Sequence, residues 1–131
     1  MSLRFAGYAA LFGQPDGARD TILPGAFART LAARREPLPL YWQHRPDQPI
    51  GLVESAEEDP RGLRVIARID NPTGRAAAML KHGAVSGLSF GYRARSFRHE
   101  QSGRVLEEID LFEVSLVTHP LQHAARVHLV A

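Results

Sequence analysis

The sequence predicts an α+β fold that is mainly β, a barrel or a sandwich with a few short helices. Proline and glycine recur about every ten residues, as expected where short strands are joined by turns. Residues 63–70 alternate apolar and polar side chains, which is typical of a strand with one buried face. Predicted strands outnumber predicted helices, which favours a β architecture. A length of 131 residues favours one domain over 1–131, and 44% hydrophobic residues supply a core.

The first half of the chain contains the opening strand and one helix. "LRFAGYAALF" predicts a strand over 3–12, and "QPDGARDTI" predicts a loop. A helix over 23–36 begins through Pro24, with Phe27 and Leu31 on its buried face. The next expected elements are a strand over 38–44 that ends at His44, a turn over 45–49 and a strand over 50–59.

The second half adds a hairpin, a helix and two long strands. Residues 60–62 join the strand over 50–59 to a strand over 62–70. "NPTGRAAAMLKHG" predicts a helix with Thr73 as N-cap and Gly83 as its stop. The remaining elements are a strand over 85–97, a polar turn over 98–104 and a closing strand over 105–119.

Composition excludes several classes of function. The chain has no cysteine, which removes thiol catalysis and cysteine-ligated zinc. Its net charge is +2, and the basic residues are spread along the chain among acids, so we expect no direct nucleic-acid binding. The first residues do not read as a secretory signal, and no apolar run has the length of a membrane span. We therefore expect a soluble intracellular domain that contacts no membrane.

The stretch "GLSFG", residues 87–91, fits the G-x-S-x-G pattern of serine hydrolases. In α/β-hydrolases that serine lies on a strand-to-helix elbow, in a much longer chain. Here a predicted helix precedes the serine, and Leu88, Phe90 and Tyr92 alternate with polar or small residues. This alternation predicts a strand whose Ser89 side chain faces away from the apolar face. The elbow interpretation therefore fails.

A nucleophilic serine needs a base. Of the six histidines, His44 differs because it ends the aromatic strand "LYWQH", at a position typical of catalytic groups on β scaffolds. A histidine that merely caps a strand edge explains the same pattern. A second alternative is a zinc site formed by His119 and His123 with His44 or Glu113, although Pro120 interrupts the helical spacing that such a pair needs.

Four segments in order give the chain a family resemblance. They are "GYAALFG" with "ILPGAF", "LYWQHRPDQPIG", "SGLSFGY" and "DLFEVSLVTHP". With these segments the chain resembles the tailed-phage prohead maturation proteases, which are distant relatives of the herpesvirus assembly protease. The resemblance implies a herpesvirus-protease-like antiparallel β-barrel with a few short helices.

Carried over position by position, the resemblance makes Ser89 the nucleophile and His44 the general base. Glu113 stands where the viral relatives carry a second histidine, and a carboxylate there would orient the imidazole. Asp110 and His119 are the alternatives for this third member. Rival nucleophiles are Ser86 and Ser115.

Two departures from the family pattern leave these three residues in place. Arg45 follows His44 where the family often has an acid, so Arg45 is a candidate for contacting substrate carboxylates. "HPLQHA" stands where "PAN" is usual. The oxyanion donors stay open between backbone N–H groups near Ser89 and an arginine such as Arg93.

The resemblance implies a serine endopeptidase without cofactor or metal. Its expected substrates are the major capsid protein precursor, the scaffold segments and itself, inside the immature capsid (prohead) in the cytoplasm of a bacterial host. The source particle would be a phage, a prophage or a gene transfer agent, and a homodimer or higher oligomer is a state to look for. The alternative is a non-catalytic capsid assembly or scaffold protein that retains the protease fold.

Overall fold

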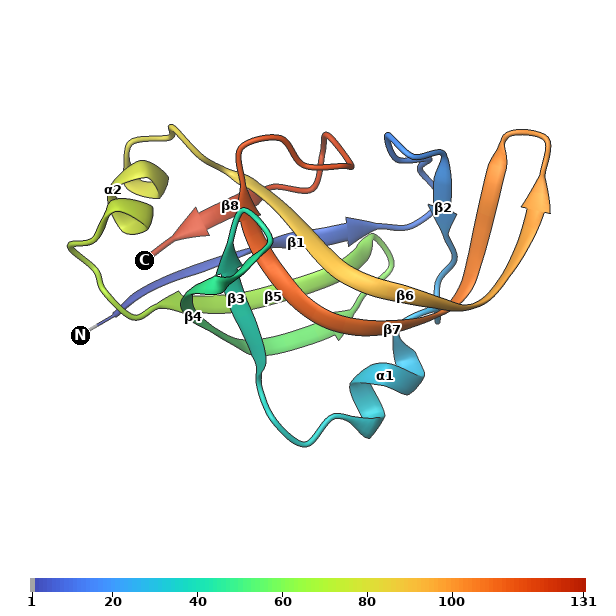
Figure 1. Cartoon of the computed structure of the whole chain (residues 1–131), viewed down its shortest axis with the longest axis horizontal. Coiled ribbons are helices and arrows are strands. Elements are labelled where there is room, and N and C mark those ends of the chain that lie inside the picture. The colour runs from blue at the N-terminus through green and yellow to red at the C-terminus, as the bar shows by residue number, and fades with distance from the viewer. Residues whose placement is uncertain (1) are drawn as a thin grey trace.

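A computed structural model describes residues 2–131. Most of the chain is one curled sheet, and the two short helices lie at its periphery (Figure 1). The strands are β1 (Leu3–Leu11), β2 (Asp20–Ile22), β3 (Leu38–Trp42), β4 (Arg45–Glu58), β5 (Gly62–Ile69), β6 (Gly87–Glu100), β7 (Gly103–Val117) and β8 (Val127–Val130). The helices are α1 (Ala28–Ala33) and α2 (Arg75–Lys81). The predicted mainly β class is confirmed.

Strand β7 organises the sheet. It pairs with β6 along one edge, antiparallel, and with both β2 and β3 along the other edge, in parallel. The order then continues from β3 through β4, β5 and β1 to β8 in antiparallel pairs. The barrel is therefore mostly antiparallel, with two parallel pairs where short strands meet β7.

The segment before β8 links the two edges of the curled sheet. The Leu88 N–H donates to Ala125 O (2.9 Å) and the Val127 N–H donates to Ser86 O (2.8 Å), so this segment lies beside the start of β6. The Tyr8 N–H donates to Arg126 O (3.2 Å), which attaches the same segment to β1. These hydrogen bonds connect β6 to β1 through the segment before β8 and so bring the two edges of the curled sheet together.

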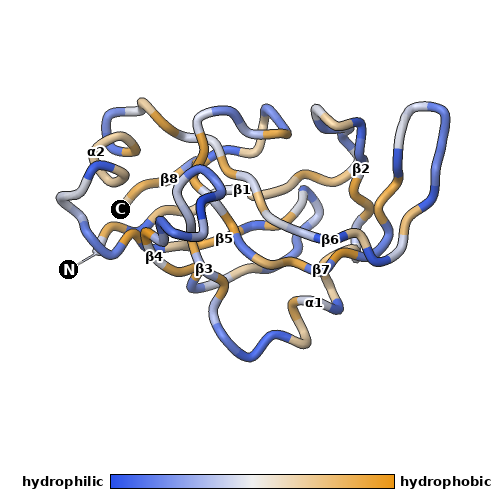
Figure 2. Tube along the Cα trace, in the orientation of Figure 1, coloured by the Kyte–Doolittle hydropathy of each residue, from blue (hydrophilic) through white to orange (hydrophobic). Residues whose placement is uncertain are grey.

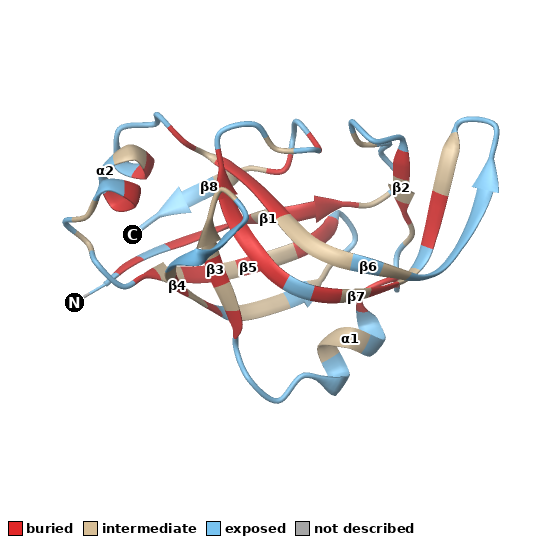
Figure 3. Ribbon diagram, in the orientation of Figure 1, coloured by how far each residue is buried: buried red, intermediate tan, exposed pale blue. Residues whose placement is uncertain are grey.

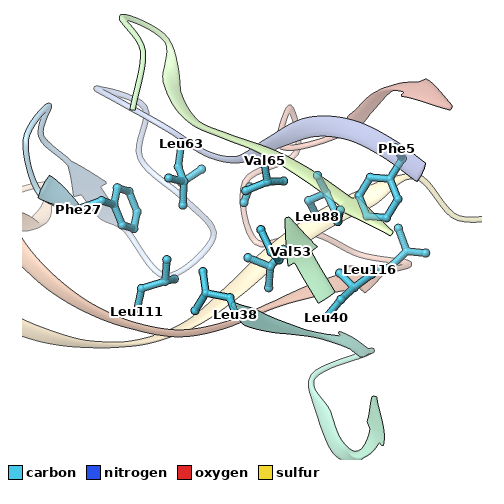
Figure 4. Packing of buried hydrophobic residues seen from close by; sticks show 14 of the residues in the cluster. Phe5, Phe27, Leu38, Leu40, Val53, Leu63, Val65, Leu88, Leu111 and Leu116 are labelled. Atoms are coloured by element: carbon cyan, nitrogen blue, oxygen red, sulfur yellow. The ribbon is translucent and has the colours of Figure 1, made fainter. Parts of the chain in front are cut away.

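The core lies inside this curl. Apolar residues concentrate along the strands, and most of the buried residues lie in the same strands (Figures 2 and 3). Figure 4 shows ten labelled members of the cluster, contributed by α1's flank and by six strands. Leu88 is fully buried, and Phe90 packs edge-on against Phe27, with ring centroids 5.5 Å apart. The apolar face predicted for residues 88–92 is confirmed.

Several predicted boundaries were wrong. Residues 45–49, expected as a turn, belong to β4, and the turn lies earlier, at Gln43–His44. The loop predicted over 14–22 contains β2, and the sequence analysis did not predict β8. The polar stretch over 98–104 is mostly strand, because β6 and β7 continue to a tip at residues 101–102.

The helices also differ from the prediction at their N-terminal ends. Helix α1 begins at Ala28, four residues after Pro24, and spans six residues. The N-cap of helix α2 is Gly74 and not the predicted Thr73, whose hydroxyl donates to Asn71 Oδ1 (3.1 Å). The predicted stop at Gly83 is confirmed by its left-handed φ of +75°. No helix within residues 2–131 is long and apolar enough to cross a membrane.

Candidate active site

His44 lies on a strained two-residue turn. Trp42 pairs with Arg45, so the hairpin between β3 and β4 has only Gln43 and His44 at its tip. Their φ angles are +54° and +60°. Positive φ at both central residues is the mark of a type I′ turn, which normally takes asparagine and glycine. Two larger side chains keep this conformation only where surrounding contacts hold them, a pattern common at functional sites.

The contacts that hold the turn come from the end of β7. The Gln43 N–H donates to Leu116 O (3.0 Å). The Gln43 side chain donates from Nε2 to Thr118 Oγ1 (2.6 Å) and accepts from the Thr118 N–H at Oε1 (3.1 Å). The turn is therefore fixed to β7, while 43% of the His44 side chain stays exposed.

Glu113 on β7 binds the His44 ring. His44 Nδ1 lies 2.6 Å from Glu113 Oε1, and Glu113 is buried, with 8% of its surface exposed. The second carboxylate oxygen accepts from Ser115 Oγ (2.6 Å), and the same hydroxyl accepts from the His44 N–H (3.2 Å). Ser115 thus links the backbone of His44 to the carboxylate that holds its ring, and both oxygens of Glu113 are engaged.

This arrangement raises the pKa of His44. The hydrogen bond that His44 Nδ1 donates to the Glu113 carboxylate raises the pKa of the imidazole above its usual 6.5. Partial burial opposes this shift, and the negative charge of Glu113 adds to it. A carboxylate on Nδ1 fixes the ring orientation, leaves Nε2 to accept a proton, and stabilises the imidazolium that results. The pair can therefore act as an oriented base.

Ser89 lies on β6 directly across from Ser115 on β7. Directly opposed side chains of an antiparallel pair project from the same face, so Ser89 shares the face that carries Ser115 and Glu113. The Ser89 residue is 8% exposed. Its hydroxyl has no hydrogen-bond partner within residues 2–131, whereas every fully buried side-chain polar atom there has one, so this hydroxyl reaches solvent.

Gly91 makes room for the Glu113 carboxylate. It pairs with Glu113 across β6 and β7, and a Cβ added at Gly91 would lie 2.5 Å from Glu113 Oε1. That is the oxygen that contacts His44. The second glycine of G-x-S-x-G, Gly91, therefore leaves space for the carboxylate. The first, Gly87, lies equally close to Pro120, because a Cβ added there would lie 2.7 Å from Pro120 Cδ.

The alternative residues lie elsewhere or are already engaged. Asp110 binds Arg93 (Oδ2 to Nη2, 2.8 Å), so this acid and this candidate oxyanion donor contact each other. The Ser86 hydroxyl accepts from Arg126 (3.0 Å). His119 is exposed on the segment after β7. No group of three or more metal-binding side chains occurs within residues 2–131.

The residues that support the three site candidates were not predicted from the sequence. The bridging role of Ser115 and the space at Gly91 follow from the β6–β7 register, and the Gln43–Thr118 pair follows from the turn. The alternation of Glu113, Ser115 and Val117 along β7 was a usable signal, because it places these side chains on one face.

Comparison with known proteins gives two curated relatives and a family. The family described as "Caudovirus prohead serine protease" matches residues 1–131. The prohead protease of Enterobacteria phage HK97 is 32% identical over 130 residues, covering 94% of this chain and 58% of the relative. The capsid polyprotein of Pseudomonas phage PAJU2 is 30% identical over 124 residues, covering 86% of this chain and 18% of the relative. The chain thus spans less than two thirds of either relative.

Solved structures show the same fold at low sequence identity. The KSHV protease, crystallised with a hexapeptide phosphonate inhibitor, gives a TM-score of 0.70 at 16% identity, covering 100% of this chain and 65% of that one. The bacteriophage T4 capsid assembly protease gives 0.66 at 14% identity, covering 87% and 80%. The predicted likeness to herpesvirus proteases is confirmed at the level of the fold.

Proposed function

Because this chain belongs to the caudovirus prohead serine protease family, we propose that it is a serine endopeptidase of capsid maturation. The observation that carries the proposal is the 2.6 Å contact between His44 Nδ1 and Glu113 Oε1 on the face of the sheet that bears Ser89. This contact orients the base, and the Ser89 hydroxyl on the same face reaches solvent. Ser89, His44 and Glu113 are the proposed catalytic residues.

The proposed reaction is acyl transfer through Ser89. His44 Nε2 takes the proton of the Ser89 hydroxyl as Oγ attacks the peptide carbonyl carbon. The imidazolium then gives this proton to the leaving amine, and the acyl-enzyme forms. A water molecule, deprotonated by His44, attacks the ester and releases the acid and free Ser89. Glu113 holds Nδ1 throughout and stabilises the charged ring.

The proposed mechanism needs a hydrogen bond between His44 and Ser89 that the structure of residues 2–131 does not contain. Within residues 2–131 no hydrogen bond joins Ser89 to His44, although the His44 N–H is bonded to Ser115, the residue opposite Ser89. Catalytic hydrogen bonds commonly tighten only when substrate is bound. The His44 side chain is 43% exposed, and we propose that bound substrate brings Nε2 to the Ser89 hydroxyl.

The proposed substrates are scaffold segments of the capsid precursor and the protease itself, inside the prohead in the bacterial host. The names of the two phage relatives, a prohead protease and a capsid polyprotein, support a capsid-related substrate. In the second relative the matching segment is a small part of a much longer chain. A protease segment joined to capsid sequence needs a cut to leave it, which supports self-cleavage.

The decisive experiment compares the wild type with Ser89→Ala. A fluorophosphonate probe should label the wild type at Ser89, identified by peptide mass spectrometry, and should leave the variant unlabelled. Co-expressed with the capsid precursor, the variant should fold normally and leave the precursor uncut. Normal processing by Ser89→Ala would refute the assignment. A folded wild type that neither labels nor cleaves, even within assembled proheads, would favour the non-catalytic assembly protein.

A further inference from the structure

A cleft of about 520 Å³ lies beside the turn that carries His44. Gln43 and Arg45, the two neighbours of His44, both line it. Thr118 and His119, which follow β7, form another part of the wall. The remaining lining residues are Trp42 at the end of β3, and Arg75 and Met79 on α2. The cleft thus lies between the catalytic turn, the end of β7 and α2.

The ionisable side chains that line this cleft are all basic. Its lining contains Arg45, Arg75 and the imidazole of His119, and no acidic side chain. Neither arginine forms an ion pair within residues 2–131, whereas Arg4 and Arg104, for example, bind Glu54 and Asp20. Trp42 and Met79 add an apolar wall against which an aliphatic stem can lie. This lining fits a side chain with a short aliphatic stem and a carboxylate at its end.

The position of the cleft relative to Ser89 fits a substrate subsite. Thr118 follows Val117, which pairs with Gly87, two residues before Ser89 on β6. An extended peptide advances about 3.3 Å per residue, so a side chain a few residues from the bond attacked by Ser89 reaches a cleft on this side. Thr118 also binds Gln43, so the cleft and the catalytic turn share one support.

We propose that this cleft is a specificity subsite for a glutamate side chain of the substrate peptide, with Arg45 and Arg75 as its carboxylate-binding residues. Guanidinium groups bind carboxylates through paired, charge-assisted hydrogen bonds, and His119 supplies a further donor. This inference rests on the proposed protease function and specifies its substrate class.

The test uses capped hexapeptide pools with glutamate fixed at one position at a time, each matched to a pool with glutamine at that position. At one position the glutamate pool should be cleaved about tenfold faster in kcat/KM, as expected for hydrogen bonds to a charged group. Arg45→Gln and Arg75→Gln should each reduce this preference, mainly through KM. Arg75→Glu should instead favour a pool with lysine at the same position. Arg35→Gln, in the exposed segment after α1, is the matched control and should leave the preference unchanged.

Binding gives a second readout that needs no cleavage. Trp42 is the only tryptophan of the chain and lines the cleft, so its fluorescence reports occupancy. In Ser89→Ala, glutamate pools should change this fluorescence at about tenfold lower concentration than glutamine pools. Added salt should weaken the binding of the glutamate pools. Equal cleavage of both pools, equal binding, or a preference that survives Arg45→Gln combined with Arg75→Gln would overturn the subsite. The protease assignment would survive each of these outcomes, because it depends on the labelling and cleavage at Ser89.

Discussion

Glu113 controls the proton affinity of His44, and this residue pair sets the expected pH dependence. Because Glu113 raises the pKa of His44 above 6.5, and the base must be neutral to accept a proton, kcat/KM should rise with pH through that raised pKa. Glu113→Gln should move the rise to lower pH and reduce the maximal kcat/KM on the order of 10²- to 10⁴-fold. A pH–rate profile with a peptide substrate measures both. An unchanged profile in this variant would remove Glu113 from the catalytic group.

Gly91 provides a separate test of the same carboxylate. Gly91→Ala places a methyl group 2.5 Å from Oε1 of Glu113, too close for the carboxylate to keep its position against His44. We expect a fall in kcat together with a pH profile shifted toward lower pH, as in Glu113→Gln. Gly17→Ala is the control, because its added carbon meets the flexible end of Leu121 at 3.3 Å. A lower melting temperature with an unchanged pH profile would mean that Gly91 is only structural.

The three site candidates could be predicted from the sequence, but the contacts among them could not. Ser89, His44 and Glu113 were selected because their segments resemble a family in order and spacing. Which residue faces which across β6 and β7 depends on three irregularities in that pairing, beginning between Gly91 and Tyr92. Apolar alternation does not show such bulges, and each one reverses the faces that follow.

At the scale of elements, the turn between β3 and β4 explains the clearest wrong prediction. Pro46 and Pro49 suggested a turn over 45–49, whereas the chain reverses at Gln43–His44, a pair without the usual turn residues. Proline is tolerated in β4 there because pairing with β5 begins only at Gly51, so this stretch has a free edge. Contacts from β7, which are distant in sequence, select the actual turn.

Strand β2 is held by an ion pair between Asp20 and Arg104, which the sequence pattern does not predict. Asp20 is 3% exposed and accepts two hydrogen bonds from Arg104 on β7 (2.9 and 2.8 Å) and one from Tyr92 on β6 (2.9 Å). Arg104 lowers the pKa of Asp20, and burial with this carboxylate raises the pKa of Tyr92 to about 12. A three-residue strand in a loop was missed because tertiary contacts form it.

Asp20→Asn should therefore loosen β2. We expect the free energy of unfolding at pH 7, measured by urea denaturation, to fall by about 1.5–3 kcal/mol, the range for hydrogen bonds to charged groups. Because the folded pKa of Asp20 is lowered, its contribution is present above the usual value of 3.8 and is lost as pH falls below it. The difference between wild type and variant should therefore shrink below about pH 4. A difference that is constant with pH would contradict this account.

At the scale of the whole molecule, Gln122 joins the C-terminal segment to β1. Its side chain accepts from the Leu11 N–H (2.8 Å) and donates to Leu11 O (2.9 Å) and Gln14 O (3.1 Å), in a buried position. Gln122→Ala leaves buried backbone groups of Leu11 without partners and should cost about 2–4 kcal/mol of unfolding free energy. Gln101→Ala, at the exposed tip of the β6–β7 arm, is the control and should be nearly neutral.

We propose that residues 1–131 unfold as one cooperative domain, because a single core cluster receives side chains from nearly every strand. Calorimetry should give one transition for the wild type and one, at lower temperature, for Gln122→Ala. Two separate transitions would mean that the chain contains two independently unfolding units.

The mainly β class was predictable from strand patterning, whereas the parallel pairs on β7 were not, because pairing between distant strands leaves no local signal.

The pairing of β2, β3 and β6 with β7 has a consequence for biosynthesis. The ribosome makes these three strands before the strand that they share, and Glu113 and Ser115 belong to that late strand. A nascent chain halted before residue 113 already contains Ser89 and His44, but nothing yet fixes the turn or orients the imidazole. If the proposed function holds, peptide cleavage should therefore begin only after translation of β7.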